Sequence, residues 1–300
     1  MDFLNYTEWQ DIADTLHLLL QITGKVKLAN APRRPEWGHI RQYLTLDGIT
    51  TGIIPADPVC FEIRFNFRAN EAGFYNDHGK AAIVKLEDGK SVGAYYRQFI
   101  SALKEIDAAT EIHVRSQEFY DPVDLDKDEK HHAYGQKEVS IWLENMLFAY
   151  KALNRFIAPY RGKTYGPAYY FGTMDLSCQV FSGETAPWGK SGKVMPFNFD
   201  ERNYECGFWP GDPQFPEPGF YAFPYPFIRD LKGNEKFLRP DKAVYKPDKT
   251  AFFFTLKDAM NYPNPEIMAA DFCQSGFELI QEVDRWKNLD WITRPLDYPG

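Results

Sequence analysis

The chain has 300 residues, 44% hydrophobic and 25% charged, a composition typical of a globular protein. The formal net charge is -8, and Lys and Arg are scattered without runs. Nucleic acids and anionic membranes bind basic faces, so neither is an expected partner. The first ten residues, MDFLNYTEWQ, lack the pattern of a signal peptide, and no apolar run reaches the length of a membrane span. We therefore expect a soluble, cytoplasmic protein.

Cysteine and histidine residues give no sign of a metal site. The cysteines lie in apolar or strand-like patterns without metal-ligand spacing, which predicts free, buried thiols: Cys60, Cys178, Cys206 and Cys273. His131 and His132 follow an acidic loop, but adjacent histidines cannot both point into one site. We expect no metal and no cofactor.

Helical periodicity predicts four main helices. The first begins with a capping box at Thr7, carries Trp9, Ile12, Leu16 and Leu19 on one face, and ends at Gly24. Amphipathic helices follow Ser91, span residues 139–157, and begin again after Asn264 with proline in the first turn. Lys25 and Lys163 each follow a glycine at a predicted helix end. There they are expected to neutralise helix carbonyls rather than to bind an anion.

Alternating apolar and polar residues predict strands at residues 59–67, 110–115 and 173–180, and the apolar run in TAFFFTL predicts a buried strand at 250–256. Asp77-His78-Gly79 is expected to be a hairpin turn, because glycine tolerates positive φ. Helices and strands recur in a similar order along the chain, which predicts an α+β fold of mostly antiparallel sheets with flanking helices. We expect a single domain over residues 1–300, built by pseudo-two-fold duplication of halves at about 7–118 and 136–290.

The segment 207–226, GFWPGDPQFPEPGFYAFPYP, contains six prolines and seven aromatic residues. Proline removes amide donors, so a helix is excluded and long strand pairing is not expected. Disordered segments contain few aromatic residues, so this one must dock on a larger surface as a wall, lid or pocket lining.

One strand offers a polar row as the partner of that segment. Asp175, Ser177 and Gln179 share a strand face with Thr173, opposite an apolar face. Such a row meets water or lines a polar cavity. The cavity alternative predicts a binding protein for a small, partly apolar ligand or a sugar, in an aromatic-walled pocket. Its expected ligand-binding residues are Asp175, Ser177, Gln179, Trp209, Phe220, Tyr221 and Tyr225.

Two other functions remain open. A hydrolase would use Asp175 with His131 and Tyr134 as weak candidate acid–base groups, which requires these residues to meet in space. A structural or interaction protein would present Pro213-Gln214-Phe215-Pro216 as an extended ligand for a partner's aromatic groove. The oligomeric state does not follow from the sequence.

Several blocks of the chain are distinctive: Trp9, the Gly172–Leu176 block GTMDL, Phe181-Ser182-Gly183, Ala186-Pro187 and above all GFWPG at 207–211. Through these blocks the chain resembles, over about residues 7–290, the DUF5996 family of bacterial proteins of unknown function. The resemblance implies no assigned activity.

The chain departs from the family pattern at several positions. Asn66 replaces an aspartate, and histidines usual in the family are absent at Asn70, Ala168 and Glu201, whereas Tyr134 and Asp175 are retained. The resemblance therefore implies a retained scaffold or binding role rather than catalysis by those histidines.

Overall fold

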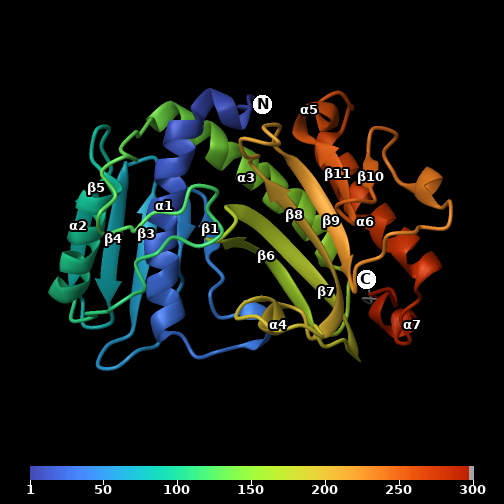
Figure 1. Cartoon of the computed structure of the whole chain (residues 1–300), viewed down its shortest axis with the longest axis horizontal. Helices are drawn as coiled ribbons and strands as arrows, with labels where there is room; N and C mark the ends of the chain where they lie inside the picture. The colour runs from blue at the N-terminus through green and yellow to red at the C-terminus, as the bar shows by residue number, and fades with distance from the viewer. Residues whose placement is uncertain (297–300) are drawn as a thin grey trace.

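A computed structural model describes residues 1–296 and contains two antiparallel sheets that lie side by side (Figure 1). The first sheet has the order β1-β2-β3-β4-β5, and the second has the order β10-β11-β9-β8-β7-β6. The strands of the first are β1 (Tyr43–Thr45), β2 (Gly48–Thr50), β3 (Phe61–Asn66), β4 (Glu71–Asn76) and β5 (Ala81–Lys85). Those of the second are β6 (Thr164–Tyr170), β7 (Asp175–Thr185), β8 (Glu201–Trp209), β9 (Gly219–Tyr225), β10 (Val244–Lys246) and β11 (Ala251–Thr255).

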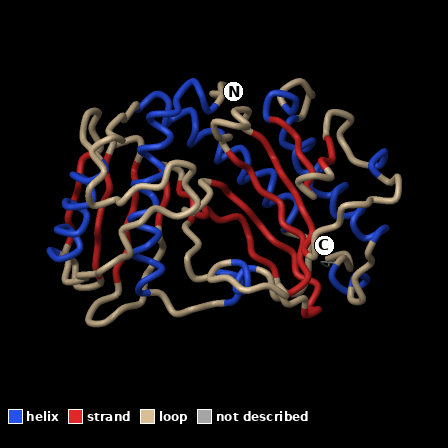
Figure 2. The backbone as a smooth tube through the Cα atoms, in the orientation of Figure 1, coloured by secondary structure: helices blue, strands red, loops and turns tan. Residues whose placement is uncertain are grey.

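Helices pack against these sheets (Figure 2). The long ones are α1 (Tyr6–Asn30), α2 (Val92–Glu105), α3 (Gln136–Ile157) and α6 (Pro265–Val283). The short ones are α4 (Met195–Asn198), α5 (Leu256–Ala259) and α7 (Leu289–Ile292), with 3-10 turns η1 (Pro35–Trp37) and η2 (Glu235–Phe237). The predicted α+β class with antiparallel sheets is confirmed, as are the starts of α2 at Ser91 and of α6 at Asn264.

The two sheets meet where the edge of β1 approaches the edge of β6. Gln42 and Tyr169 exchange backbone hydrogen bonds of 3.0 and 2.8 Å. A single cluster of buried apolar side chains extends through both halves. Each half follows the order helix, sheet, helix, but β11 lies between β9 and β10, with no counterpart in the first sheet. Duplication therefore stays a prediction.

Each strand of the second sheet divides its side chains between two environments. Leu176, Cys178 and Val180 of β7 are buried in the apolar cluster, and α3 and α6 cover this face. The Tyr204 hydroxyl donates to the Cys273 carbonyl oxygen of α6 at 3.1 Å, which places that side chain on the helix side too. The predicted polar row of β7 consequently faces away from these helices.

Helix α1 is buried on every side through most of its length. All residues from Ala13 to Lys27 are buried. The helix begins one residue after Asn5, whose backbone N–H donates to Glu8 Oε2 at 2.7 Å, so the predicted cap at Thr7 is wrong by two residues. It also continues through Gly24, which was expected to end it.

Gly24 is required by close packing rather than by a helix end. A Cβ atom at this position would lie 2.1 Å from Cδ1 of Phe171. The glycine therefore lets the segment after β6 pack directly on α1. Lys25 and Lys163 do not cap helices as predicted: Lys25 is buried within α1, and Lys163 lies after α3 and forms ion pairs with Glu36 at 2.6 Å and Glu201 at 2.7 Å.

Two expectations about strands are wrong. Half of segment 207–226 pairs as strand, at the end of β8 and along β9. Pro224 is tolerated there because it lies beyond Ala222, where the pairing of β9 with β11 ends. Residues 110–115 form only an isolated bridge at Arg115. The chain just beyond them is attached to α1 instead: Gln21 donates to the Gln117 carbonyl and accepts from its N–H, both at 2.8 Å.

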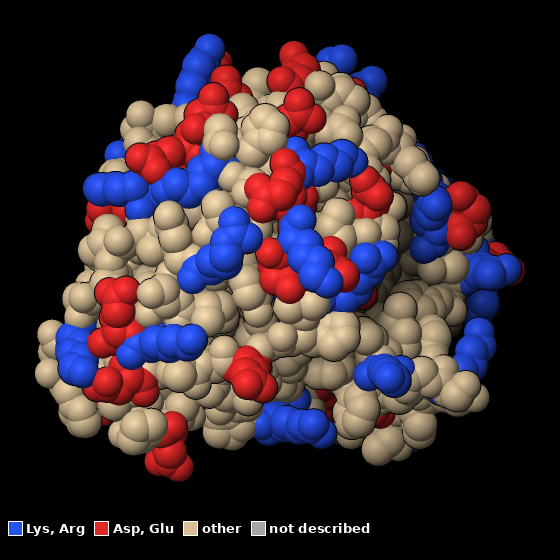
Figure 3. Space-filling view, turned by 60° about the vertical axis from the view of Figure 1, so that its left-hand side comes forward, with Lys and Arg blue, Asp and Glu red and all other residues tan. Residues whose placement is uncertain are grey.

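The surface carries charges of both signs. On the face shown in Figure 3, Lys and Arg side chains alternate with Asp and Glu side chains. Among the helices within residues 1–296, none combines the length and apolar character needed to cross a membrane.

Candidate functional site

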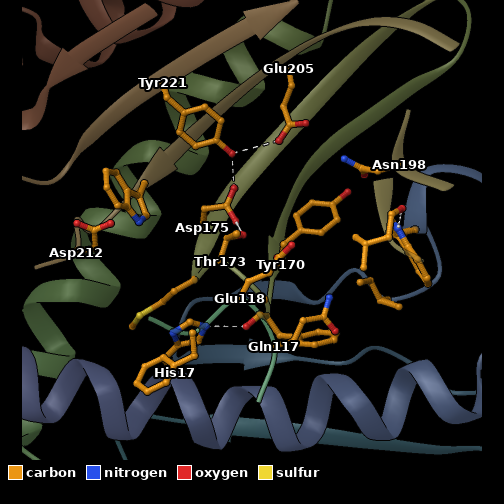
Figure 4. A pocket seen from close by; sticks show the side chains of 18 of the residues that line it. His17, Gln117, Glu118, Tyr170, Thr173, Asp175, Asn198, Glu205, Asp212 and Tyr221 are labelled. Atoms are coloured by element: carbon orange, nitrogen blue, oxygen red, sulfur yellow. Dashed lines mark hydrogen bonds between the residues drawn. The ribbon is translucent and has the colours of Figure 1, made fainter. Parts of the chain in front are cut away.

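A cavity of about 740 Å³ lies between α1 and the face of the second sheet that points away from α3 and α6. Figure 4 shows side chains of the second sheet entering it from one side and His17 of α1 from the other. Its floor is formed by residues of β6 to β9 and β11: Tyr170, Asp175, Gln179, Glu205, Trp209, Tyr221, Phe223, Ala251 and Phe253. Residues 117–120, 193–199 and 211–212 close its sides.

A hydrogen-bond network around Asp175 crosses the floor of this cavity. Asp175 is 5% exposed, and its carboxylate accepts from the hydroxyls of Thr173 and Tyr221. Tyr221 also lies 3.2 Å from Oε1 of Glu205, and Gln179 Nε2 donates to the other oxygen of that carboxyl group at 2.7 Å. Three neighbouring strands thus bring two carboxyl groups to one phenol.

The position of Tyr221 depends on Gly207 of the adjacent strand. The two residues are opposite each other in the β8–β9 register. A Cβ atom on Gly207 would lie 2.3 Å from Cζ and 2.4 Å from the hydroxyl oxygen of Tyr221. Because residue 207 has no side chain, the ring lies across β8 and reaches Asp175 of β7. This is the local reason for a glycine within a strand.

Gly207→Ala is expected to lower the free energy of unfolding by about 1–3 kcal/mol, because the added methyl group overlaps the Tyr221 ring. Displacement of the ring should also remove its hydrogen bond to Asp175. The measurement is urea unfolding, with Gly166→Ala in β6 as the control, since a Cβ there meets no atom within 4 Å. Equal stability of the two variants would contradict the close packing of Tyr221.

Burial favours the protonated forms of the two carboxyl groups. Burial, and then the charge of Asp175, raises the pKa of Glu205 to about 7 despite hydrogen bonds from Gln179, Ser177 and Tyr221. Burial also raises the pKa of Asp175, against the hydrogen bonds from Thr173 and Tyr221. A protonated Glu205 donates to the Tyr221 oxygen, while the Tyr221 proton is donated to Asp175. The network therefore holds a proton near neutral pH.

The opposite wall contributes a neutral histidine and a third carboxyl group. His17 Nε2 lies 2.8 Å from the Phe171 carbonyl oxygen, and burial lowers its pKa to about 4. Its imidazole is therefore neutral at physiological pH. Glu118 lines the cavity, and its own backbone has a left-handed φ of 52°. Its side chain is exposed at the rim of the cavity, and the charge of Asp175 contributes to the increase in its pKa.

Four of the seven predicted ligand-binding residues line the cavity: Asp175, Gln179, Trp209 and Tyr221. Ser177 belongs to the same strand face and is 2% exposed. Phe220 lies on the opposite face of the sheet, where its ring is 6.2 Å from that of Phe148 of α3. Tyr225 stacks on Phe199 at 4.5 Å, behind the wall that Phe199 forms. The alternation along β9 accounts for the separation of Phe220 from Tyr221.

The candidate acid–base residues Asp175, His131 and Tyr134 are not hydrogen-bonded to one another. His131 Nδ1 lies 2.8 Å from Oδ2 of Asp128, and the Tyr134 hydroxyl donates to Asn70 at 3.0 Å. Neither side chain lines the cavity that contains Asp175. Their partners belong to the first half of the chain.

Sequence reasoning missed Glu205, because segment 207–226 was treated as irregular and β8 was not expected. A signal was present: Asn203, Glu205 and Gly207 alternate with buried Tyr204, Cys206 and Phe208, which indicates a strand with one polar face. Glu118 lies in a loop, and periodicity carries no information about such a position.

No metal-binding arrangement is found in the part of the chain described, residues 1–296. Groups of three or more His, Cys, Asp or Glu side chains that could surround an ion do not occur there. The four cysteines are free thiols, and three of them are buried.

Comparison with known proteins identifies one family model, which matches residues 2–291 and is described as a family of unknown function (DUF5996). No curated protein and no solved structure matches the chain.

Proposed function

We propose that this chain, which belongs to the DUF5996 family of unknown function, is a binding protein for a small, partly apolar molecule. The observation that carries the proposal is the cavity of about 740 Å³ with the Asp175–Tyr221–Glu205 network on its floor. Cavities of this volume are common for small-molecule sites, which combine apolar walls with a few placed polar groups.

The apolar walls favour a ligand with a flat or aliphatic part. Trp209, Phe223 and Phe253 belong to the lining, and the Tyr221 and Phe223 rings stack at 6.0 Å with an interplanar angle of 11°. Aromatic faces of this kind pack against rings and against the apolar face of a sugar. The polar network lies beside them and would orient a ligand.

We expect at least one member of a metabolite and sugar library to raise Tm, because a ligand at 100 times its Kd stabilises a protein by about 2.7 kcal/mol. Asn198→Trp should abolish this shift, since Asn198 lines the cavity from α4 and a large ring would occupy the space. Asn261→Trp is the matched control, because Asn261 is exposed and does not line the cavity.

Differential scanning fluorimetry measures the shift in Tm, and isothermal calorimetry measures binding of the same compounds. Stabilisation of Asn198→Trp by the same compounds, to the same extent as the wild type, would show that they bind elsewhere. The absence of any stabilising compound would argue against a binding protein.

A further inference from the structure

The deep end of the cavity offers hydrogen-bond acceptors in excess of donors. Gln179 is 3% exposed, its amide N–H donates to Glu205, and its Oε1 has no hydrogen-bond partner. The single proton of Tyr221 serves two carboxyl groups, those of Asp175 and Glu205. A buried acceptor without a donor destabilises the folded protein. A ligand that brings N–H donors to this corner would satisfy these atoms.

The same corner holds carboxyl groups that no cation balances once Glu205 is ionised, above its pKa of about 7. In residues 1–296, no Lys or Arg forms an ion pair with Asp175, Glu205 or Glu118. The lysines among the lining residues, Lys193 and Lys249, are exposed. Buried carboxylates are usually paired with a positive charge.

Aromatic faces lie next to these carboxyl groups. Tyr170 is opposite Asp175 in the β6–β7 register, and Trp209 and Phe223 continue the lining across β8 and β9. Rings of this type attract a positive charge within about 6 Å of their centres and cover the apolar part of a ligand. The surroundings therefore suit a cation attached to an apolar body.

We propose that the ligand is an organic cation whose ammonium or guanidinium group binds Asp175, Glu205 and Gln179 Oε1, with its apolar part against Trp209 and Phe223. The inference rests on the proposed function and concerns the chemistry of the ligand. An anionic ligand would meet like charges, and a neutral polyol would leave the carboxylates without a counter-charge.

Binding of such a cation is coupled to release of a proton. The titratable groups around Glu205 come from three strands: Tyr170 of β6, Asp175 of β7 and Tyr221 of β9. Arg41, whose charge acts against the raised pKa of Tyr170, does not line the cavity. Glu118 faces Asp175 from the opposite wall. Apart from Arg41, all of these groups are neutral or anionic, and the pKa of Glu205 is about 7. A bound ammonium group therefore replaces the proton of Glu205, and affinity for it increases as pH rises from 6 to 8.

The experiment compares probes of similar shape and different charge by calorimetry at pH 8. The cationic probes are the amines 2-phenylethylamine, tyramine and agmatine. The neutral probes are 2-phenylethanol and methyl glucoside, and the anionic probe is phenylacetate. We expect 2-phenylethylamine to bind at least tenfold more tightly than 2-phenylethanol and phenylacetate. Repeating the titration at pH 7 in phosphate and in Tris should reveal proton release, because these buffers differ in ionisation enthalpy.

Two substitutions assign the site. Glu205→Gln and Asp175→Asn should each weaken amine binding at least tenfold and change 2-phenylethanol binding less than twofold. Glu62→Gln on β3 of the other sheet is the matched control and should bind amines like the wild type, because Glu62 is not part of the cavity. Comparing two probes on one variant separates lost charge from lost folding, and Glu205→Gln keeps the test valid if Asp175→Asn unfolds.

Tighter binding of the neutral or anionic probe than of the amine, blocked by Asn198→Trp, would overturn the cation inference and leave the proposed function intact. Amine binding that survives both Glu205→Gln and Asn198→Trp would also overturn it. A library screen without any ligand would contradict the proposed function itself, and with it this inference.

Discussion

Gly24→Val is expected to lower the free energy of unfolding by about 3 kcal/mol or more and to lower Tm by several degrees. The reason is the contact with Phe171, whose Cδ1, Cγ and Cβ atoms would lie 2.1, 2.3 and 2.8 Å from an added Cβ. Helix propensity alone predicts the opposite sign, since glycine within a helix costs about 1 kcal/mol relative to alanine. Chemical denaturation of both proteins measures the difference.

A double-mutant cycle identifies Phe171 as the cause. Phe171→Ala removes the ring and should itself cost about 3–5 kcal/mol, because Phe171 is 1% exposed. The combined variant should then be more stable than the sum of the two losses predicts, since valine fills part of the vacated space. Strict additivity would show that Phe171 does not restrict residue 24.

Glu205→Gln is expected to remove a large pH dependence of stability. The pKa of Glu205 is raised from 4.5 to about 7 by burial and by Asp175. A carboxyl group with a raised pKa binds its proton more tightly in the folded state. Its contribution to stability is therefore fully present below about pH 4.5 and is lost as pH rises through about 7. The difference corresponds to at most about 3 kcal/mol.

Urea unfolding from pH 4 to pH 8.5 measures this effect. The wild type should lose stability over that range, and Glu205→Gln should lose less and be the more stable protein at pH 8. Part of the decline should remain, because burial also raises the pKa of Glu36 to about 7. Glu62→Gln should show no such gain at pH 8, since Arg64 and Thr50 lower the pKa of Glu62 against partial burial. Parallel curves for wild type and Glu205→Gln would contradict a protonated Glu205.

Much of the architecture could be predicted from periodicity, because each long element has one uniform face. Residues 59–67 and 173–180 alternate strictly and form β3 and the start of β7. Ser91 caps α2 through its side chain, which accepts from Ala94 N–H at 3.2 Å. The polar row of β7 was also identified, and two of its residues, Asp175 and Gln179, line the cavity.

The errors arise where distant packing determines local structure. Gly24 has the signature of a helix end, but the Phe171 ring, which lies far along the chain, determines its role. Glu205 became part of the candidate site because β8 lies between β7 and β9, a topology that sequence patterns do not contain. Tyr221 and Phe220 are adjacent in sequence, yet they lie on opposite faces of the sheet.

The burial of α1 on every side from Ala13 to Lys27 has a consequence for synthesis of the chain. Helix α1 is synthesised before Phe171, so its contact with that residue requires the chain beyond β6. Until then the side of α1 that contacts Phe171, at His17 and Gly24, is uncovered. We therefore expect truncated chains that end before β6 to aggregate or to bind chaperones, and the nascent protein to acquire protease resistance only after β6 and Phe171 have been synthesised.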